Sequence, residues 1–374
     1  TVKKYFFAKL IVTISAALCF AFGLAACSED GGGKQYDYLV TFDYNVGALS
    51  DNEYTQQYLG VKSGGKVAIQ PGYSDSFKEQ VITGYYNEGW YLAQTDGEGN
   101  PVVNEDKRVA LGEKWNFASD TVTADVTLYA NLLQKPTLTI VGGDERIVWD
   151  GLPGEVRRRP SAALQPKKEN ATFYGYFEDE LYTKPFVWES DKAYTYEAGV
   201  HKTVYARFLE GNWSIVKTAS EFNNALTGNN KIYVDADLDF TQTPFIAGKE
   251  FGGEINGNHH KLTGISCTLT GTKNRTGNFG LFGTLKASAN LYDFTVENAS
   301  VTFTSNFANP DYKAALFAWK IQSGARLTGL TVTGTVQKGS LMAGSAVVLY
   351  GFCAIDEGAV QSECDFTGIT GNEV

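Results

Sequence analysis

The sequence predicts a mainly β protein in which two small sheet domains precede a short right-handed parallel β-helix. Short runs rich in β-branched and aromatic residues are separated by Gly, Asn and Asp, and no long amphipathic helical pattern occurs among them. The pattern of sequence motifs changes near residues 135 and 213. In the last part, phenylalanine recurs with a period of about 35 residues, which is typical of stacked repeats.

Residues 1–26 have the layout of a bacterial secretory signal. Lys3, Lys4 and Lys9 make the start basic, and an uncharged apolar or small run extends from Leu10 to Ala26. The alternative is a membrane-spanning helix. That run is at the lower limit of length for crossing a hydrocarbon core of about 30 Å, so we interpret the segment as a signal peptide.

The ending Leu24-Ala25-Ala26-Cys27 resembles the lipobox of bacterial lipoprotein precursors. The resemblance implies cleavage before Cys27 and attachment of a diacylglycerol to its thiol. Two acyl chains hold a protein stably on a membrane, whereas one chain binds only marginally. The expected partner of the mature N-terminus is therefore the membrane, through the lipid on Cys27, and the expected location is extracytoplasmic, at the cell surface.

Residues 27–37 are expected to form a flexible tether between this anchor and the folded part. The stretch Ser28–Lys34 (SEDGGGK) is charged and rich in Gly, and such a segment cannot bury enough apolar surface to order itself. The folded part is therefore expected to begin near residue 38.

Charge and cysteine content argue against two classes of protein. The chain has 32 Lys and Arg against 42 Asp and Glu, a net charge of −10 at pH 7. Nucleic-acid binding draws most of its affinity from phosphate neutralisation by basic residues, so no nucleic-acid partner is predicted. Beyond Cys27 the remaining cysteines are odd in number, which predicts small buried thiols and no disulfide framework at Cys267, Cys353 and Cys364.

Residues 38–132 are expected to form a small sheet domain with an aromatic core. Leu39-Val-Thr-Phe-Asp43 alternates apolar and polar residues, and Gly89-Trp90-Tyr91, Trp115-Asn116-Phe117 and Val122–Ala130 follow in order. These motifs resemble the Listeria–Bacteroides repeat, also called the internalin B-repeat. The resemblance implies a β-grasp-like fold that serves as a stalk or contact module and carries no catalytic residue.

Residues 133–213 resemble a degenerate second copy of this repeat. Leu138–Val141 stands for the first strand, Gly175-Tyr176-Phe177 for the Gly-Trp-Tyr motif and Thr203–Ala206 for the last strand. The opening departs from the family pattern, because Arg157-Arg-Arg-Pro160 lies where a Gly-rich turn is expected. The resemblance implies a second β-grasp-like domain.

Residues 214–374 are expected to form the parallel β-helix, with a helical cap at its N-terminus. Thr218 and Glu221 have the spacing of a capping box. A 35-residue repeat follows, and its rungs would each bury an apolar side on the next. Its markers are Phe282, Phe317 and Phe352, with Phe251 and Leu262-x-x-Ile265 interpreted as an earlier copy; glycines at the corners, where a positive φ is expected, are Gly283, Gly324, Gly329 and Gly334.

The phrase Phe251–Ile265 (FGGEINGNHHKLTGI) resembles the GLUG-type repeats of bacterial surface proteins. Gly280-Leu-Phe-Gly283 resembles the rung motif of the same repeats. The resemblance covers residues 214–374 and implies a β-helix in a cell-surface protein.

Asp235, Asp237 and Asp239 form a regular polar row in the run Ile232–Phe240, which is expected to be one strand with the three carboxylates on one face. Two interpretations are open, a weak Ca²⁺ site and a solvated outer face beside the cap. Alternate Cβ atoms on a strand are roughly 6.5–7 Å apart. That is wide for ligands that bind Ca²⁺ at about 2.4 Å, and it favours the solvated face. No cofactor is predicted.

Tyr85, Tyr86, Trp90 and Tyr91 are the candidate ligand platform of the first domain. Aromatic rings on an exposed sheet face can bind a sugar or a protein, and buried rings supply the core. We expect most of the four to be core. One or two exposed rings would suffice for a weak, multivalent adhesin.

Two classes of function remain open. The expected function is adhesion or surface interaction, with a glycan or a host or cell-surface protein as partner. The alternative is a polysaccharide-active β-helix enzyme, a lyase or glycosidase, or its accessory. The sequence has no His-Glu-x-x-His, Gly-x-Ser-x-Gly or phosphate-loop motif, so no catalytic residue is predicted.

Overall fold

The computed structural model describes residues 36–49, 55–72, 77–79, 81–189, 193–273, 278–309 and 311–371. This part of the chain is mainly β, with parallel strands throughout its C-terminal half, which confirms the predicted class. Two compact units divide the described residues. The first contains those up to Ile140, with Ile147–Leu164 and Val187–Val204; the second contains Val141–Arg146, Gln165–Phe186 and those from Tyr205 onward.

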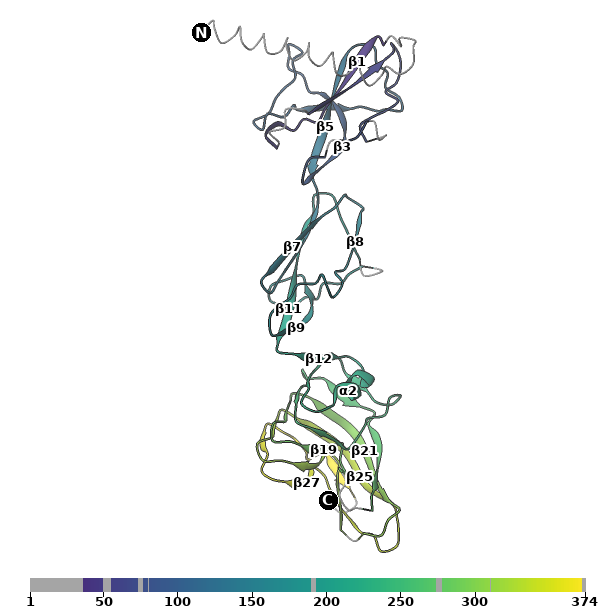
Figure 1. The fold of residues 1–374 in the computed structure, drawn as a ribbon, viewed down its shortest axis with the longest axis vertical. Helices are drawn as coiled ribbons and strands as arrows, with labels where there is room; N and C mark the ends of the chain where they lie inside the picture. Colours follow the sequence, from purple (N-terminus) through teal and green to yellow (C-terminus); the bar gives the residue numbers. More distant parts are fainter. Residues whose placement is uncertain are drawn as a thin grey trace. The chain divides into compact units, whose positions relative to one another are not determined.

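The first sheet has the strand order β2-β1-β5-β3-β4 (Figure 1). Strand β1 runs parallel to β5 and antiparallel to β2, and β3 runs antiparallel to both β5 and β4. A 3-10 turn follows β1. The elements are β1 (Tyr38–Asp43), η2 (Gly47–Leu49), β2 (Gln56–Val61), β3 (Tyr85–Ala93), β4 (Leu111–Lys114) and β5 (Val126–Gln134).

One face of this sheet carries the core of the first unit. Val40 and Phe42 in β1 are fully buried, as the alternation of Leu39–Asp43 predicts, and Leu128 and Ala130 in β5 lie beside them. The ring of Phe42 packs edge-on against Trp90, with the two centroids 4.8 Å apart. The core therefore contains the expected aromatic rings, packed among aliphatic side chains.

A second sheet has the order β7-β6-β11-β9, and a separate two-stranded ladder pairs β10 with β8. The order repeats that of the first sheet. In each, the earliest strand lies between its successor in the sequence and the last strand. The strands are β6 (Thr137–Gly142), β7 (Glu145–Asp150), β8 (Val156–Arg158), β9 (Ala171–Phe177), β10 (Ala193–Thr195) and β11 (His201–Glu210).

The C-terminal part forms several parallel ladders, here called the parallel stack (Figure 1). The first ladder comprises β12 (Trp213–Val216), β13 (Lys231–Val234), β16 (Glu254–Asn256), β20 (Asn290–Tyr292), β24 (Arg326–Thr328) and β28 (Val360–Ser362). The second comprises β14 (Leu238–Asp239), β17 (Lys261–Thr263), β21 (Thr295–Ser305), β25 (Thr331–Leu341) and β29 (Ile369–Gly371), with β18 (Ser266–Gly271) beside β21. The third comprises β15 (Lys249–Phe251), β19 (Phe282–Leu285), β23 (Ala318–Ile321) and β27 (Cys353–Asp356), and β22 (Tyr312–Ala315) pairs with β26 (Val347–Tyr350).

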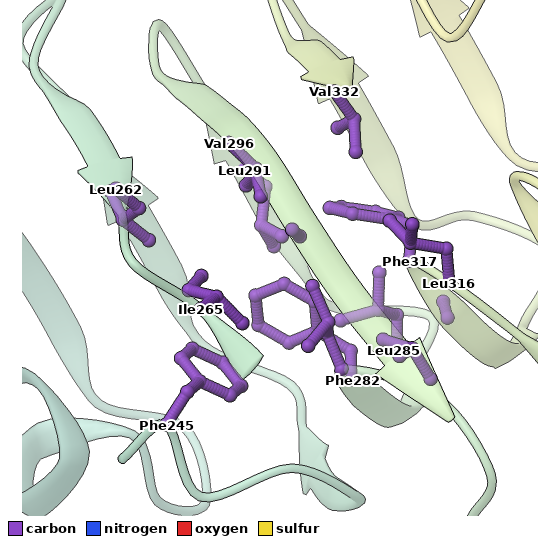
Figure 2. Close-up of a cluster of buried hydrophobic side chains, with 14 of the residues drawn as sticks. Phe245, Leu262, Ile265, Phe282, Leu285, Leu291, Val296, Leu316, Phe317 and Val332 are labelled. Carbon is purple, nitrogen blue, oxygen red and sulfur yellow. The ribbon is translucent and has the colours of Figure 1, made fainter. Parts of the chain in front are cut away.

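The core of the parallel stack lies between these ladders. Phe317 is fully buried, and its ring centroid lies 5.2 Å from that of Phe282 and 5.9 Å from that of Phe352. The 35-residue phenylalanine period therefore marks a physical column of rings, as predicted. Figure 2 shows apolar side chains of successive strands, among them Leu291, Val296 and Val332, pointing into the same interior.

A left-handed corner recurs after each of the last three strands of the first ladder. Asp293, Gly329 and Glu363 occupy equivalent places after β20, β24 and β28, with φ of +57°, +60° and +55°. The corner glycine was predicted at Gly329 and is confirmed. Gly283 was predicted at a corner and lies instead inside β19, where a Cβ would collide with Asn278 and the Gly248 backbone.

The earliest repeat differs from its prediction in register. Leu262 pairs with Val296, and Ile255 is the residue that pairs with Leu291. Phe251 pairs with Leu285 and so lies outside the phenylalanine column. The corner between β16 and β17 is two residues longer than the next one, and Asn258 and His259 adopt positive φ there. The prediction was therefore wrong about which residue of the earliest repeat corresponds to Leu291.

The helical cap is confirmed. Helix α2 (Ala219–Ala225) begins after Thr218, whose hydroxyl accepts from the Glu221 backbone N–H while the Glu221 side chain accepts from the Thr218 N–H. Phe222 and Leu226 are fully buried. They join the core of the parallel stack, so the helix packs by the face that the sequence predicted.

Candidate binding surface

The four residues of the predicted platform lie on opposite faces of the first sheet. Trp90 is 3% exposed and belongs to the core, and Tyr85 packs against that core. Tyr86 and Tyr91 are half-buried and lie on the other face, which we call the outer face. Trp90 and Tyr85 are therefore core residues, whereas Tyr86 and Tyr91 are not, so fewer of the four lie in the core than was expected.

A β-bulge in β3 decides which ring faces outward. Asn87 pairs with Leu132 and Trp90 with Ala130, so β3 has one more residue than β5 between the two pairs. Strict alternation from Tyr85 would turn Trp90 outward. The extra residue reverses that phase, places Trp90 in the core and turns Tyr91 to the outer face.

The strand register places a row of five side chains across the outer face, one from each strand. Asp43 pairs with Gln56 on one side and with Tyr129 on the other, and Tyr91 pairs with Tyr129 and with Lys114. We call Gln56, Asp43, Tyr129, Tyr91 and Lys114 the tyrosine row. Two half-buried tyrosines stand at its centre, with polar side chains at both ends.

Hydrogen bonds fix the end of the row near Lys114. Glu88 accepts from the Lys114 ammonium at 2.5 Å, from the Tyr91 hydroxyl at 2.6 Å and from Asn131 at 3.3 Å. The Lys114 hydrogen bond is the largest cause of a lowered pKa at Glu88, and the same bond raises the pKa of Lys114. Glu88 is therefore ionised at neutral pH and anchors the Tyr91 ring.

The opposite end of the row is also ordered. Asp43 accepts from the Gln56 side-chain amide at 2.6 Å and from the Asn45 backbone N–H at 2.7 Å. Burial raises the pKa of the neighbouring Tyr129, with a further contribution from the charge of Asp43. Tyr129 is therefore a neutral, partly desolvated ring at the centre of the face.

Sequence reasoning missed Tyr129. It lies between Leu128 and Ala130, both fully buried, so alternation along β5 places it on the outer face. The segment Val122–Ala130 was interpreted only as a motif of the repeat. Its alternation was the signal that could have identified this residue.

The three aspartates of the predicted polar row are held apart. Ile232–Phe240 was expected to be one strand. The structure has two short strands there, β13 and β14, with a break between them. Asp235 pairs with Lys217 at 2.8 Å and accepts from the Tyr174 hydroxyl. Asp237 accepts from the Lys261 backbone N–H at 2.9 Å and contacts His260, and Asp239 accepts from the Thr241 N–H at 2.8 Å.

These bonds have electrostatic consequences for the two exposed members. The Lys261 N–H is the largest cause of a lowered pKa at Asp237, and the Thr241 hydroxyl is the largest cause of a lowered pKa at Asp239. Among the described residues, no group of three or more His, Cys, Asp or Glu side chains is arranged to hold a metal ion. Each carboxylate thus has its own protein partner.

We expect added Ca²⁺ to leave the melting temperature of the protein unchanged within about 1 °C, because a ligand stabilises only the state that binds it. Asp237→Ala should be equally insensitive to Ca²⁺, although it loses the bond to Lys261. Differential scanning calorimetry with millimolar Ca²⁺, and Mg²⁺ as the control, measures both. A Ca²⁺-dependent rise that Asp237→Ala abolishes would instead establish the weak Ca²⁺ site.

The remaining candidates are placed as follows. Cys27 lies outside the described residues. Cys267, Cys353 and Cys364 are partly buried, free thiols against the core of the parallel stack, and burial raises the pKa of Cys267 and of Cys353 to about 11. Within the ranges that the structure describes, no helix is long and apolar enough to cross a bilayer.

Comparison with known proteins gives limited support. No family model matches the chain, and no solved structure matches it. A curated protein of Evansella cellulosilytica, named "Putative Gly-rich membrane protein", is 27% identical over 178 residues, which cover 42% of this chain. The matched region is 18% of that protein's length, so the chain spans less than a fifth of this relative.

Proposed function

We propose that the chain is a cell-surface lipoprotein that serves in adhesion, held to the membrane through Cys27 and binding a glycan or a protein with its β domains. The lipobox-like ending before Cys27 supports the anchor. The word "membrane" in the relative's name is consistent with it. The observation that carries the binding role is the outer face of the first sheet, which displays tyrosines outside the core.

We further propose that the first two sheets are β-grasp-like modules. Their common strand order, in which the earliest strand is central beside the last, supports the proposal. The parallel pairing of β1 with β5, flanked by antiparallel strands, is the mixed topology that such a fold requires.

For the parallel stack, we propose a right-handed β-helix. Ile255, Leu291 and Leu327 follow one another in the first ladder at intervals of 36 residues, and each interval visits the other ladders before returning. Parallel crossover connections are almost always right-handed. The stacked phenylalanine column adds the continuous interior that this fold needs.

The adhesion role is tested by retention of the purified protein on an array of glycans and surface proteins, with turnover of the same glycans measured in parallel. We expect retention without product formation. Product formation without retention would favour the polysaccharide-active enzyme and overturn the proposal.

The anchor is tested by metabolic labelling. Radiolabelled palmitate is expected to enter the wild-type chain and to be absent from Cys27→Ala, because only the thiol of Cys27 would receive the lipid. The variant should also leave the membrane fraction. Equal labelling of the two chains, or of neither, would exclude lipidation at Cys27.

A further inference from the structure

We infer that the tyrosine row is a binding site for neutral glycans. The inference rests on the proposed adhesive role and names the ligand class and the residues. Its elements are two half-buried tyrosines at the centre and fixed hydrogen-bonding groups at both ends.

The centre of the row provides an apolar floor. Tyr129 and Tyr91 are directly opposite on antiparallel strands, and such neighbours have Cβ atoms about 4.5–5.5 Å apart. The face of an aromatic ring carries partial negative charge, which attracts the weakly positive C–H groups on one side of a pyranose. The Lys114 ammonium lies 5.5 Å from the centroid of the Tyr91 ring, so the floor rests mainly on Tyr129.

The ends of the row provide the polar contacts that a sugar needs. Sugar hydroxyls donate to carboxylates and accept from amides and ammonium groups, and charged partners strengthen such bonds. Asp43 and Gln56 supply both kinds at one end, and Glu88 and Lys114 supply both at the other. A carboxylate has about four lone-pair positions, so Asp43 and Glu88 can accept further bonds beyond those they already make.

The charges favour a neutral ligand over an acidic one. Asp43 and Glu88 place a carboxylate on each side of the rings, and Lys114 is already paired with Glu88 at 2.5 Å. The whole chain is also acidic, with a net charge of −10. A uronate or phosphate on the floor would therefore face repulsion from both ends of the row.

The size of the surface favours a glycan over a folded protein. A standard protein interface takes about 800 Å² and roughly 20–30 residues from each partner. The tyrosine row has five side chains, and the exposed aliphatic residues of this face, Leu39 and Leu133, are 39% and 38% exposed and lie apart from each other on β1 and β5. The Tyr91 side chain is also held in place before binding, because Glu88 accepts a hydrogen bond from its hydroxyl.

The test is affinity gel electrophoresis and calorimetry of the purified protein on neutral polysaccharides (β-glucan, mannan, xylan) and on acidic ones (pectate, alginate). Wild type is expected to bind at least one neutral polymer and none of the acidic ones. Tyr129→Ala should weaken that binding at least about tenfold, because the floor loses its central ring. Tyr129→Phe keeps the ring and should stay within about threefold of wild type.

Tyr86→Ala is the matched control. Tyr86 is a half-buried tyrosine of the same outer face, on β3 with Tyr91, but it pairs with Leu133 and lies outside the tyrosine row. The Tyr86→Ala variant should bind the neutral polysaccharide as tightly as wild type does. Melting curves of every variant establish that the first sheet is folded at the assay temperature, and Tyr129→Phe separates a loss of the ring from a loss of the fold.

The inference is overturned if wild type binds only acidic polymers, or if Tyr129→Ala and wild type bind a neutral polymer equally. It is also overturned if no glycan is bound while the protein is still retained on surface proteins. That last result leaves the adhesive role standing, whereas retention on neither glycans nor proteins removes the adhesive role as well.

Discussion

Phe317→Ala is expected to destabilise the parallel stack by about 3–5 kcal/mol, the usual cost of removing a buried phenylalanine ring. The reason is that Phe317 is fully buried and touches three other rings. Its centroid lies 5.2 Å from Phe282, 5.9 Å from Phe352 and 5.7 Å from Phe366. Removal of this ring therefore opens a cavity that several strands line at once.

The measurement is thermal and urea unfolding followed by circular dichroism. A loss of this size should lower the melting temperature of the parallel stack by roughly 6–20 °C. Phe352→Ala is the comparison, because Phe352 is only partly buried and should cost less. A change below about 1 kcal/mol for Phe317→Ala would show that the phenylalanine column is not the core of the stack.

Trp90→Ala is expected to have a comparable effect on the first sheet, again about 3–5 kcal/mol. The indole is 3% exposed, and its centroid lies 4.8 Å from that of Phe42 and 5.3 Å from that of Tyr44, both edge-on. A small domain of this kind has little free energy of unfolding to lose. The first sheet should therefore be largely unfolded at 37 °C.

Its control is Tyr91→Ala, the next residue on the strand, which faces outward and should change stability by less than about 1.5 kcal/mol. Intrinsic fluorescence and proteolysis of the first sheet distinguish the two variants. If Trp90→Ala kept its melting temperature and lost only glycan binding, Trp90 would be a ligand residue and its place in the core would be wrong.

The parts of the fold that were predictable depend on local patterns. Alternation in Leu39–Asp43 predicted the buried Val40 and Phe42, and the capping box predicted α2. The 35-residue period predicted the column formed by Phe282, Phe317 and Phe352. In each case the residues concerned are close in sequence or repeat at a constant spacing, so a single strand, turn or repeat determines the outcome.

The parts that failed depend on single extra residues or on contacts from distant segments. Leu262 was matched to Leu291 of the first ladder, whereas it belongs to β17 of the second ladder and pairs with Val296. The strand expected through Asp235, Asp237 and Asp239 is interrupted, because the chain passes there from β13 in the first ladder to β14 in the second. The pattern of apolar residues indicates neither the ladder to which Leu262 belongs nor the break between β13 and β14.

The candidate binding surface was likewise predictable in part from local patterns, and in part depends on strand pairing. Sequence reasoning placed aromatic residues at 85–91 and expected most of them in the core, but the bulge in β3 determines that Tyr91 and not Trp90 faces outward. The tyrosine row could not be seen, because its members come from five strands that are as far apart in sequence as Asp43 and Tyr129. Only the pairing register brings them onto one line.

The recurring corner at Asp293, Gly329 and Glu363 has a consequence for how such a chain changes over generations. The last rungs begin and end at equivalent corners, and each rests only on the rung before and the rung after. A duplicated or deleted stretch of about 35 residues would leave every remaining neighbour matched, whereas a gain of one residue shifts a whole strand to the wrong face. Descendants of this gene are therefore expected to differ in length by entire rungs, while the tyrosine row is left untouched.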